Sequence, residues 1–150
     1  MDFNQQFTTA SPQETARLGE ELGNYLVKSV ESRALVCLYG ELGSGKTTFV
    51  QGFAKTFGIT SRLLSPSFII VRRYPIPQSP GFLYHIDLYR VESENELPGL
   101  GLSEILADLD SVVLVEWAEK MGNLLPNERI DVRFITLENG SHQISIQRMN

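Results

Sequence analysis

A glycine-rich segment carrying one lysine and one threonine has the residue types and spacing of a phosphate site. The segment is Gly40-Glu41-Leu42-Gly43-Ser44-Gly45-Lys46-Thr47, which matches G-x-x-x-x-G-K-[ST]. Glycines let the backbone curl so that successive N–H groups point at phosphate oxygens. The Lys46 ammonium then reaches the β and γ phosphates, and the Thr47 hydroxyl ligates Mg²⁺. The pattern predicts a nucleotide-binding P-loop.

Two acids at the ends of apolar segments are candidates for the metal site and for catalysis. Glu116 follows the apolar residues 112–115, at a place where many P-loop enzymes carry an acid near the metal. From there it can hold the metal through water or orient the attacking water. Asp87 ends an apolar segment that begins at Phe82, and a carboxylate there needs a partner, either Mg²⁺ or an arginine. We expect Glu116, Asp87 and Lys46 to form the catalytic set.

Three other side chains lie near these motifs or inside apolar runs. His85 lies two residues before Asp87, but no second His or Cys stands at ligand spacing, so we interpret it as a packed or surface histidine. Ser67 heads a predicted strand, where a hydroxyl contacts the γ-phosphate or metal in switch-type proteins; a plain strand-start residue is the alternative. Cys37 is the one cysteine and is expected to be buried and inert.

The elements that must position these residues follow from apolar spacing. Residues 34–39 form a continuous apolar run, as expected of a strand buried on both faces in a parallel sheet. A helix is predicted from about residue 46 to 57, with Gly58 as its C-cap. An earlier helix starts with Ser11 as its N-cap and Pro12 in its first turn, and Glu14 completes a capping box.

The rest of the chain favours strands and one short helix. We predict strands over 67–74, 82–88 and 112–115, a helix over 102–106, and a hairpin of 130–134 with 144–146 that turns at Asn139-Gly140. Parallel β-α units and antiparallel hairpins are mixed along the chain. The sequence therefore predicts a single α/β domain over residues 1–150, a three-layer P-loop NTPase-like fold with a mixed parallel/antiparallel sheet.

Composition limits the functional classes. The 150 residues carry 13 Lys+Arg against 18 Asp+Glu, a net charge of −5, which argues against holding nucleic acid mainly by neutralising phosphates. The N-terminal segment lacks the basic and apolar regions of a signal peptide, and the longest apolar run is too short to span a bilayer. We expect a cytoplasmic protein with no membrane association.

Missing motifs narrow the class of P-loop protein further. The chain has no Asn-Lys-x-Asp and no Asp-x-x-Gly after the P-loop, which disfavours a guanine-specific GTPase. It has no Leu-Ser-Gly-Gly, which disfavours a transporter-type ATPase.

Four blocks of sequence, in their order and spacing, resemble the TsaE (YjeE) family, small bacterial P-loop ATPases needed to make threonylcarbamoyladenosine on tRNA. The blocks are Gly40-Glu41-Leu42-Gly43-Ser44-Gly45-Lys46-Thr47-Thr48, Ser65-Pro66-Ser67-Phe68, His85-Ile86-Asp87-Leu88-Tyr89-Arg90 and Val115-Glu116-Trp117. The resemblance covers almost the whole chain. The family usually has Thr where this chain has Ser67, and serine keeps the hydroxyl.

The resemblance implies an activity, cofactors and partners. The family's members bind ATP and ADP with Mg²⁺, hydrolyse ATP slowly alone, and dock on a heterodimer of TsaD and TsaB. TsaD transfers a threonylcarbamoyl group from its adenylate, made by TsaC, to an adenosine beside the anticodon. ATP hydrolysis resets the complex between turnovers. By this resemblance the chain meets tRNA only indirectly.

The resemblance also implies roles for single residues. The ATP-binding set comprises the nine residues from Gly40 to Thr48, and the adenine lies near Ser11 and Pro12. Thr47, Asp87 and Glu116 surround Mg²⁺. Trp117 lies beside Glu116, where it either fills the core or borders the nucleotide or the partner-facing rim.

A second hypothesis stays open beside the partner-dependent ATPase. The chain is alternatively a phosphotransferase acting on a small hydroxylated metabolite, with Asp87 as base and Arg72, Arg73 or Arg90 as phosphate clamps.

Overall fold

The computed structural model of the chain describes residues 4–28, 34–41, 43–60 and 70–150. Within them, the strands are Gln5–Thr9 (β1), Ala34–Tyr39 (β2), Val71–Pro75 (β3), Phe82–Asp87 (β4), Val112–Glu116 (β5), Arg129–Thr136 (β6) and His142–Met149 (β7). The helices are Pro12–Lys28 (α1), Lys46–Lys55 (α2) and Leu102–Ala107 (α3), with 3₁₀ segments at Glu94–Glu96 (η1) and Ala118–Leu124 (η2). None of these helices is long and apolar enough to cross a bilayer.

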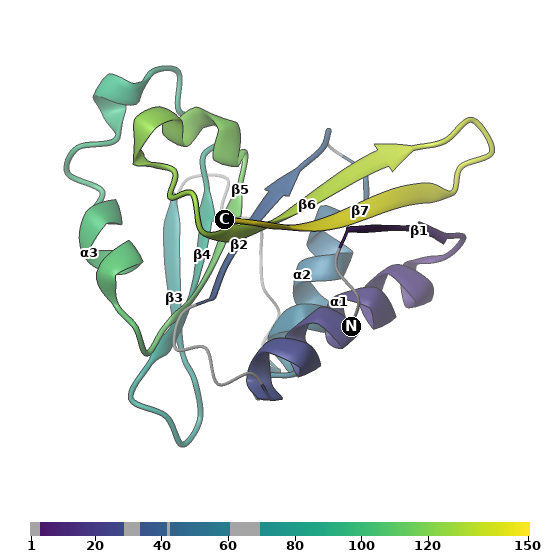
Figure 1. Ribbon diagram of the computed structural model, residues 1–150, viewed down its shortest axis with the longest axis horizontal. Coiled ribbons are helices and arrows are strands. Elements are labelled where there is room, and N and C mark those ends of the chain that lie inside the picture. The colour runs from purple at the N-terminus through teal and green to yellow at the C-terminus, as the bar shows by residue number, and fades with distance from the viewer. Residues whose placement is uncertain (1–3, 29–33, 42, 61–69) are drawn as a thin grey trace.

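All the strands form one mixed sheet in the order β1-β7-β6-β2-β5-β4-β3. Strand β2 pairs in parallel with both β5 and β6, and β4 pairs in parallel with β5. The two edges are antiparallel, formed by β3 on β4 and by β1 on the β6–β7 hairpin. Helices α1 and α2 lie together on one side of the sheet, and α3 lies on the other (Figure 1). The predicted three-layer fold with a mixed sheet is confirmed.

Each face of the sheet carries its own apolar core. Val36 and Leu38 of β2 pack into the core under α1 and α2, with the buried side chains Leu22, Phe49 and Phe53. The alternate β2 residues, Leu35 and Cys37, pack into the opposite core with α3 and η2. The prediction that Cys37 is buried is confirmed, and burial raises the pKa of its thiol to about 12, which disfavours a reactive thiolate.

Glycines let α1 and α2 approach closely. A Cβ added to Gly19 of α1 would lie 2.2 Å from the Phe49 carbonyl oxygen, and one added to Gly52 of α2 would lie 2.1 Å from the Ala16 carbonyl oxygen. No side chain heavier than hydrogen fits at either place unless the helices move apart. The contact therefore fixes α2, whose first residue is Lys46, against the helix that begins at Pro12.

A buried polar cluster joins β2 to β6 just before the glycine-rich loop. Asp131 is 2% exposed, accepts a hydrogen bond from Arg129 Nε at 2.9 Å and accepts another from the Tyr39 hydroxyl at 3.3 Å. Burial, with neighbouring Cys37 and Asp131, raises the pKa of Tyr39 above its usual range. The cluster satisfies these buried polar groups and anchors the end of β2.

The elements expected from apolar spacing are present, with differences at the ends. Helix α2 ends at Lys55 rather than 57, and Gly58 follows in the left-handed conformation at φ +83°, as its predicted capping role requires. The part of the predicted 67–74 strand that precedes residue 70 lies outside the described residues. The remaining predicted strands, the short helix and the hairpin are confirmed.

Two details were not predicted correctly. Ser11 Oγ accepts the N–H of Glu14 as expected, but the Glu14 carboxylate accepts the N–H of Ala10 at 2.8 Å, one residue before the position that a capping box uses. Strand β1 was not predicted at all. Its residues are mostly polar and exposed because it is an edge strand, held by backbone pairing with β7.

Replacing Gly52 with alanine tests the helix contact. Helix propensity alone favours alanine by about 1 kcal/mol in a helix interior. The clash of the new Cβ with the Ala16 carbonyl oxygen lowers the stability instead, because overpacking costs about 1–3 kcal/mol. The carbonyl belongs to the backbone and cannot move aside as the end of a side chain can. We expect Gly52→Ala to lower the urea midpoint, while Gln51→Ala, on the exposed side of the same helix, leaves it unchanged or slightly raised. A Gly52→Ala protein at least as stable as the parent would contradict this packing.

Candidate functional site

The glycine-rich loop leads from the end of β2 into the first turn of α2. Gly45 stands at the N-cap with φ +99°, a left-handed conformation that glycine adopts without strain. No side chain caps this helix, and its first i→i−4 bond runs from Phe49 N–H to the Gly45 carbonyl. The N–H groups of residues 46–48 therefore lack an intrahelical acceptor, and the positive end of the helix dipole lies with them. This is the local structure that binds anions.

Lys46 points from the start of α2 along the loop. Its side chain is buried, and the residue is 5% exposed. The ammonium Nζ donates to the Gly40 carbonyl oxygen at 2.5 Å and lies 4.5 Å from the centroid of the Trp117 ring. The positive charge is thus held by a carbonyl and an aromatic face. The structure places this cation beside the glycine-rich loop.

Asp87 and Glu116 lie next to one another at the carboxyl ends of two parallel strands. They are register partners in the β4–β5 ladder and are 8% and 4% exposed. Asp87 Oδ1 accepts the backbone N–H of Tyr89 at 3.0 Å, and Glu116 Oε2 lies 2.6 Å from Nε2 of His85. The two candidate acids, which are 29 positions apart in the chain, are therefore brought to one edge of the sheet.

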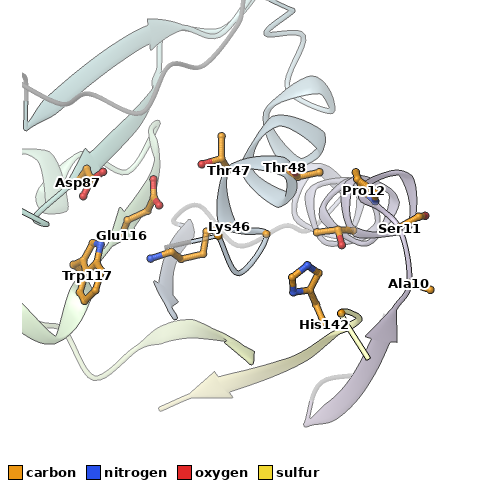
Figure 2. Close-up of a pocket in the computed structure, with 14 residues that line it drawn as sticks. Ala10, Ser11, Pro12, Lys46, Thr47, Thr48, Asp87, Glu116, Trp117 and His142 are labelled. Carbon is orange, nitrogen blue, oxygen red and sulfur yellow. The ribbon is translucent and has the colours of Figure 1, made fainter. Parts of the chain in front are cut away.

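A cavity of about 380 Å³ joins the loop to these acids, within the range of small-molecule sites. Figure 2 shows Asp87, Glu116 and Trp117 at one end, Ala10, Ser11, Pro12 and His142 at the other, and Lys46 and Thr47 between them. The described lining residues are Ala10, Ser11, Pro12, Thr15, Gly43, Gly45, Lys46, Thr47, Thr48, Asp87, Glu116, Trp117, Gly140 and His142. The glycine-rich loop and the first turn of α2 thus lie between the two ends of this cavity.

Most of the predicted site residues meet at this cavity. Among the described loop residues, Gly40, Glu41 and Ser44 do not line it, although Gly40 contacts Lys46 through its carbonyl. Leu42 and Ser67 lie outside the described residues.

Trp117 lies between the cavity and the apolar core on the α3 side of the sheet, because it lines the cavity and also packs against that core. Its side chain is half-buried, lines the cavity and packs on the Tyr89 ring at 5.4 Å between centroids. Its φ of +59° is in the left-handed region, which a bulky residue rarely adopts. This conformation directly follows β5 and turns the ring toward Lys46. The two alternatives for Trp117 are therefore not exclusive in the structure: the side chain contacts an apolar core and borders the cavity, and a role toward a nucleotide or a partner stays a prediction.

The sequence did not predict that two histidines lie at or beside the site. His85, interpreted as a packed or surface residue, is indeed buried but contacts Glu116, and His142 lines the cavity end near Ser11. The alternation along residues 82–88 correctly placed His85 on the same face as Asp87. The contact of His85 with Glu116 could not be predicted from it, because that contact depends on the pairing of β4 with β5. His142 reaches the site because the β6–β7 hairpin and β1 lie beside one another, which no short motif reveals.

The donor set suits a hard cation bound together with phosphate. Hydroxyl and carboxylate oxygens of Thr47, Asp87 and Glu116 line one cavity, and Mg²⁺ prefers oxygen ligands and usually keeps waters or phosphates in its shell. No cluster of three or more His, Cys, Asp or Glu side chains able to hold a metal occurs within the described ranges. The oxygen ligands of Thr47, Asp87 and Glu116 are the observation that fits a magnesium ion at this cavity.

A family model and similar curated proteins both point to the same family. Residues 9–144 match the model of the family described as threonylcarbamoyl adenosine biosynthesis protein TsaE. The chain is 39% identical over 124 residues to the tRNA threonylcarbamoyladenosine biosynthesis protein TsaE of Bacillus subtilis, covering 83% of this chain and 73% of that protein. It is 32% identical over 136 residues to TsaE of Treponema pallidum, covering 91% and 95%.

A solved structure agrees with this similarity. The crystal structure of Bacillus subtilis YdiB superposes with a TM-score of 0.78 at 29% sequence identity, covering 97% of this chain and 86% of that one.

The contact between Lys46 and Trp117 is testable without any ligand. Trp117 is the only tryptophan, so fluorescence excited selectively at tryptophan, and not at the five tyrosines, reports its surroundings. Removing the charge 4.5 Å from the ring by Lys46→Met should shift the emission of the unliganded protein. Lys55→Met, at an exposed lysine paired with Glu20, is the matched control and should leave the spectrum unchanged. Identical spectra for Lys46→Met and the parent would contradict the geometry.

Proposed function

The chain belongs to the TsaE family of tRNA threonylcarbamoyladenosine biosynthesis proteins, and we propose that it is the Mg-dependent ATPase subunit of that modification. The observation that carries the proposal is the single cavity that places a P-loop and an uncapped helix N-terminus beside two buried carboxylates. Anion-binding N–H groups and metal-binding oxygens meet there, as the hydrolysis of a magnesium–nucleotide complex requires.

The phosphates would lie along the loop and the first turn of α2. The backbone N–H groups of residues 43–48 would hold the phosphate oxygens, and Lys46 would leave the Gly40 carbonyl to reach the β and γ oxygens. Gly40, Glu41, Leu42 and Ser44 shape the loop. The exchange is favourable because a doubly charged phosphate group is a stronger acceptor for an ammonium than a carbonyl oxygen.

Mg²⁺ would be held by the Thr47 hydroxyl and by Asp87 and Glu116, directly or through water. When bound, the metal supplies charge neutralisation at the phosphates. The carboxylates of this chain would orient the metal's waters and the attacking water. Ser67 is proposed to contact the γ-phosphate or the metal.

The base of the nucleotide would lie at the other end of the cavity. Ser11 and Pro12 line that end as the start of α1, together with Ala10 and His142. In Figure 2, Lys46 and Thr47 lie between this end of the cavity and the two acids, Asp87 and Glu116. A bound magnesium–nucleotide has the same order, with the base at one end, the phosphates in the middle and the metal at the other end.

The partner proposed for this ATPase is the TsaD–TsaB heterodimer. The names of the relatives place them in threonylcarbamoyladenosine biosynthesis, a pathway that acts on tRNA. The net charge of −5 on this chain suits a subunit that leaves tRNA binding to a partner. Half-buried Trp117 lines the cavity and contacts the exposed Tyr89 ring, so a partner that covers Tyr89 would sense the nucleotide through this aromatic pair.

Replacing Lys46 tests nucleotide binding. We expect Lys46→Ala to weaken Mg-ATP binding about 100-fold in isothermal titration, since a hydrogen bond to a charged group contributes up to about 3 kcal/mol. The melting temperature should change little, because the ammonium contacts a carbonyl and a ring at the cavity rather than filling a core. Lys55→Ala is the control. If a folded Lys46→Ala protein bound Mg-ATP with the parental affinity, the assignment of the P-loop as the phosphate site would be wrong.

Replacing the acids separates binding from hydrolysis. Asp87→Ala and Glu116→Ala should each lower ATP turnover about 100-fold or more while ADP affinity stays within a few-fold, because the loop N–H groups do not depend on the carboxylates. Glu119→Ala, exposed and close in sequence, is the control. Turnover is measured alone and with TsaD–TsaB. Normal turnover with a lowered melting temperature in Asp87→Ala would assign that residue to a structural pair, and phosphorylation of a small acceptor would favour the phosphotransferase.

A further inference from the structure

His85 and Glu116 form a short, buried contact beside the proposed catalytic centre. Parallel pairing of β4 and β5 sets His85 opposite Leu114 and Asp87 opposite Glu116, so the histidine and the glutamate are diagonal neighbours on one face. His85 Nε2 lies 2.6 Å from Glu116 Oε2, and the two side chains are 2% and 5% exposed. Water competes little for either group at this depth.

The surroundings of the ring decide where its hydrogen lies. Nδ1 of His85 is buried and has no hydrogen-bond partner within the described residues. If Nε2 carries the hydrogen and donates to Glu116, Nδ1 keeps only an unpaired lone pair. If Glu116 were the donor instead, the ring hydrogen would sit on Nδ1 as a buried N–H with no acceptor, a rarer and costlier arrangement. The geometry therefore favours Nε2–H donating to the carboxylate.

His85 is also the only side-chain partner of this carboxylate in the described part of the chain. Lys46 lines the same cavity as Glu116 but is held by the Gly40 carbonyl and the Trp117 ring, and no ion pair joins it to Glu116 in that part of the chain. Glutamate has three side-chain torsions, so a single strong hydrogen bond removes much of its freedom. Without the histidine, the carboxylate would be buried with no donor and would be free to rotate or to pair with Lys46.

We propose that His85 is the positioning residue of Glu116: its Nε2–H holds Oε2, so that the second carboxylate oxygen is presented to the cavity in one orientation. The inference rests on the proposed ATPase function, in which Glu116 serves the metal or the attacking water. His85 touches neither and acts only through Glu116. Residues that orient a metal-site ligand in this way typically contribute 10–100-fold to metal affinity or activity.

The unliganded protein offers the first test. Side-chain ¹⁵N NMR of the two histidines reports the tautomer of each ring, and a His142→Gln variant assigns the signals. We expect His85 in the Nε2–H form, with its Nε2 resonance displaced by the short hydrogen bond and returning toward the free value in Glu116→Ala. An Nδ1–H form, or a spectrum of His85 unaffected by Glu116→Ala, would overturn the proposal whether or not the protein hydrolyses ATP.

Kinetics supply the second test. His85→Leu keeps the bulk and removes the donor, and His85→Gln keeps an N–H near the place of Nε2. We expect His85→Leu to lower kcat for Mg-ATP 10–100-fold with KM and ADP affinity within about twofold, and His85→Gln to recover most of the loss. In a Glu116→Gln background, His85→Leu should cause no further fall in kcat, because its effect runs through the carboxylate.

The outcomes are distinguishable from a failure of the proposed function. A parent protein that binds no nucleotide and shows no turnover, alone or with its partners, rejects the ATPase and leaves the NMR result to decide the His85–Glu116 interaction. A parent that hydrolyses ATP while His85→Leu keeps the parental kcat rejects the positioning role. Equal losses in His85→Leu and His85→Gln, or a further loss in the Glu116→Gln background, reject it as well. If His85→Leu does not fold, His85→Gln and the NMR test carry the decision.

Discussion

The parallel pairing of β2 with β5 is the constraint on which the site depends. In this ladder Leu38 is the partner of Glu116, so the strand that leads into the P-loop and the strand that ends at the acid finish at the same level of the sheet. The same register buries Val36 and Leu114 under α1 and α2. A slip by one residue would turn Glu116 to the opposite face of the sheet, away from the P-loop, although β5 itself is apolar on both faces. The apolar ladder that stabilises the domain thus also fixes the distance between loop and carboxylate.

The other half of the cavity depends on contacts across long stretches of sequence. The glycine-mediated approach of α1 to α2 carries the Ser11–Pro12 turn to the P-loop, and β1 pairs with β7, whose first residue is His142. Neither the α1–α2 contact nor the β1–β7 pairing is made by residues that are proposed to bind the nucleotide or the metal. A cavity of this kind is therefore sensitive to mutations at Gly19 or Gly52, which touch no ligand but set the separation of its two walls.

Local sequence signals predicted the parts of this protein that local physics determines. The P-loop, the buried run of β2, the alternation in β4 and the Asn139-Gly140 turn are each readable within about ten residues, and the structure has these elements there. Strand β1 was not predictable in this way, because an edge strand of polar residues is held by pairing with a partner far along the chain. The contact of His85 with Glu116 depended likewise on strand order, which spacing along one strand does not contain.

The charges of the unliganded site are satisfied without pairing with each other. Lys46 is held by the Gly40 carbonyl and the Trp117 ring, while Glu116 Oε2 contacts Nε2 of His85. A direct ion pair between Lys46 and Glu116 would close the cavity at its centre, and an incoming phosphate would have to break it before binding. The uncharged partners of Lys46, a carbonyl and an aromatic ring, avoid the cost of breaking an ion pair. A phosphate displaces them from the ammonium more readily than it would displace a buried carboxylate. The arrangement keeps the cation and the carboxylate apart and oriented before a ligand arrives, which is the form of preorganisation that electrostatic catalysis requires.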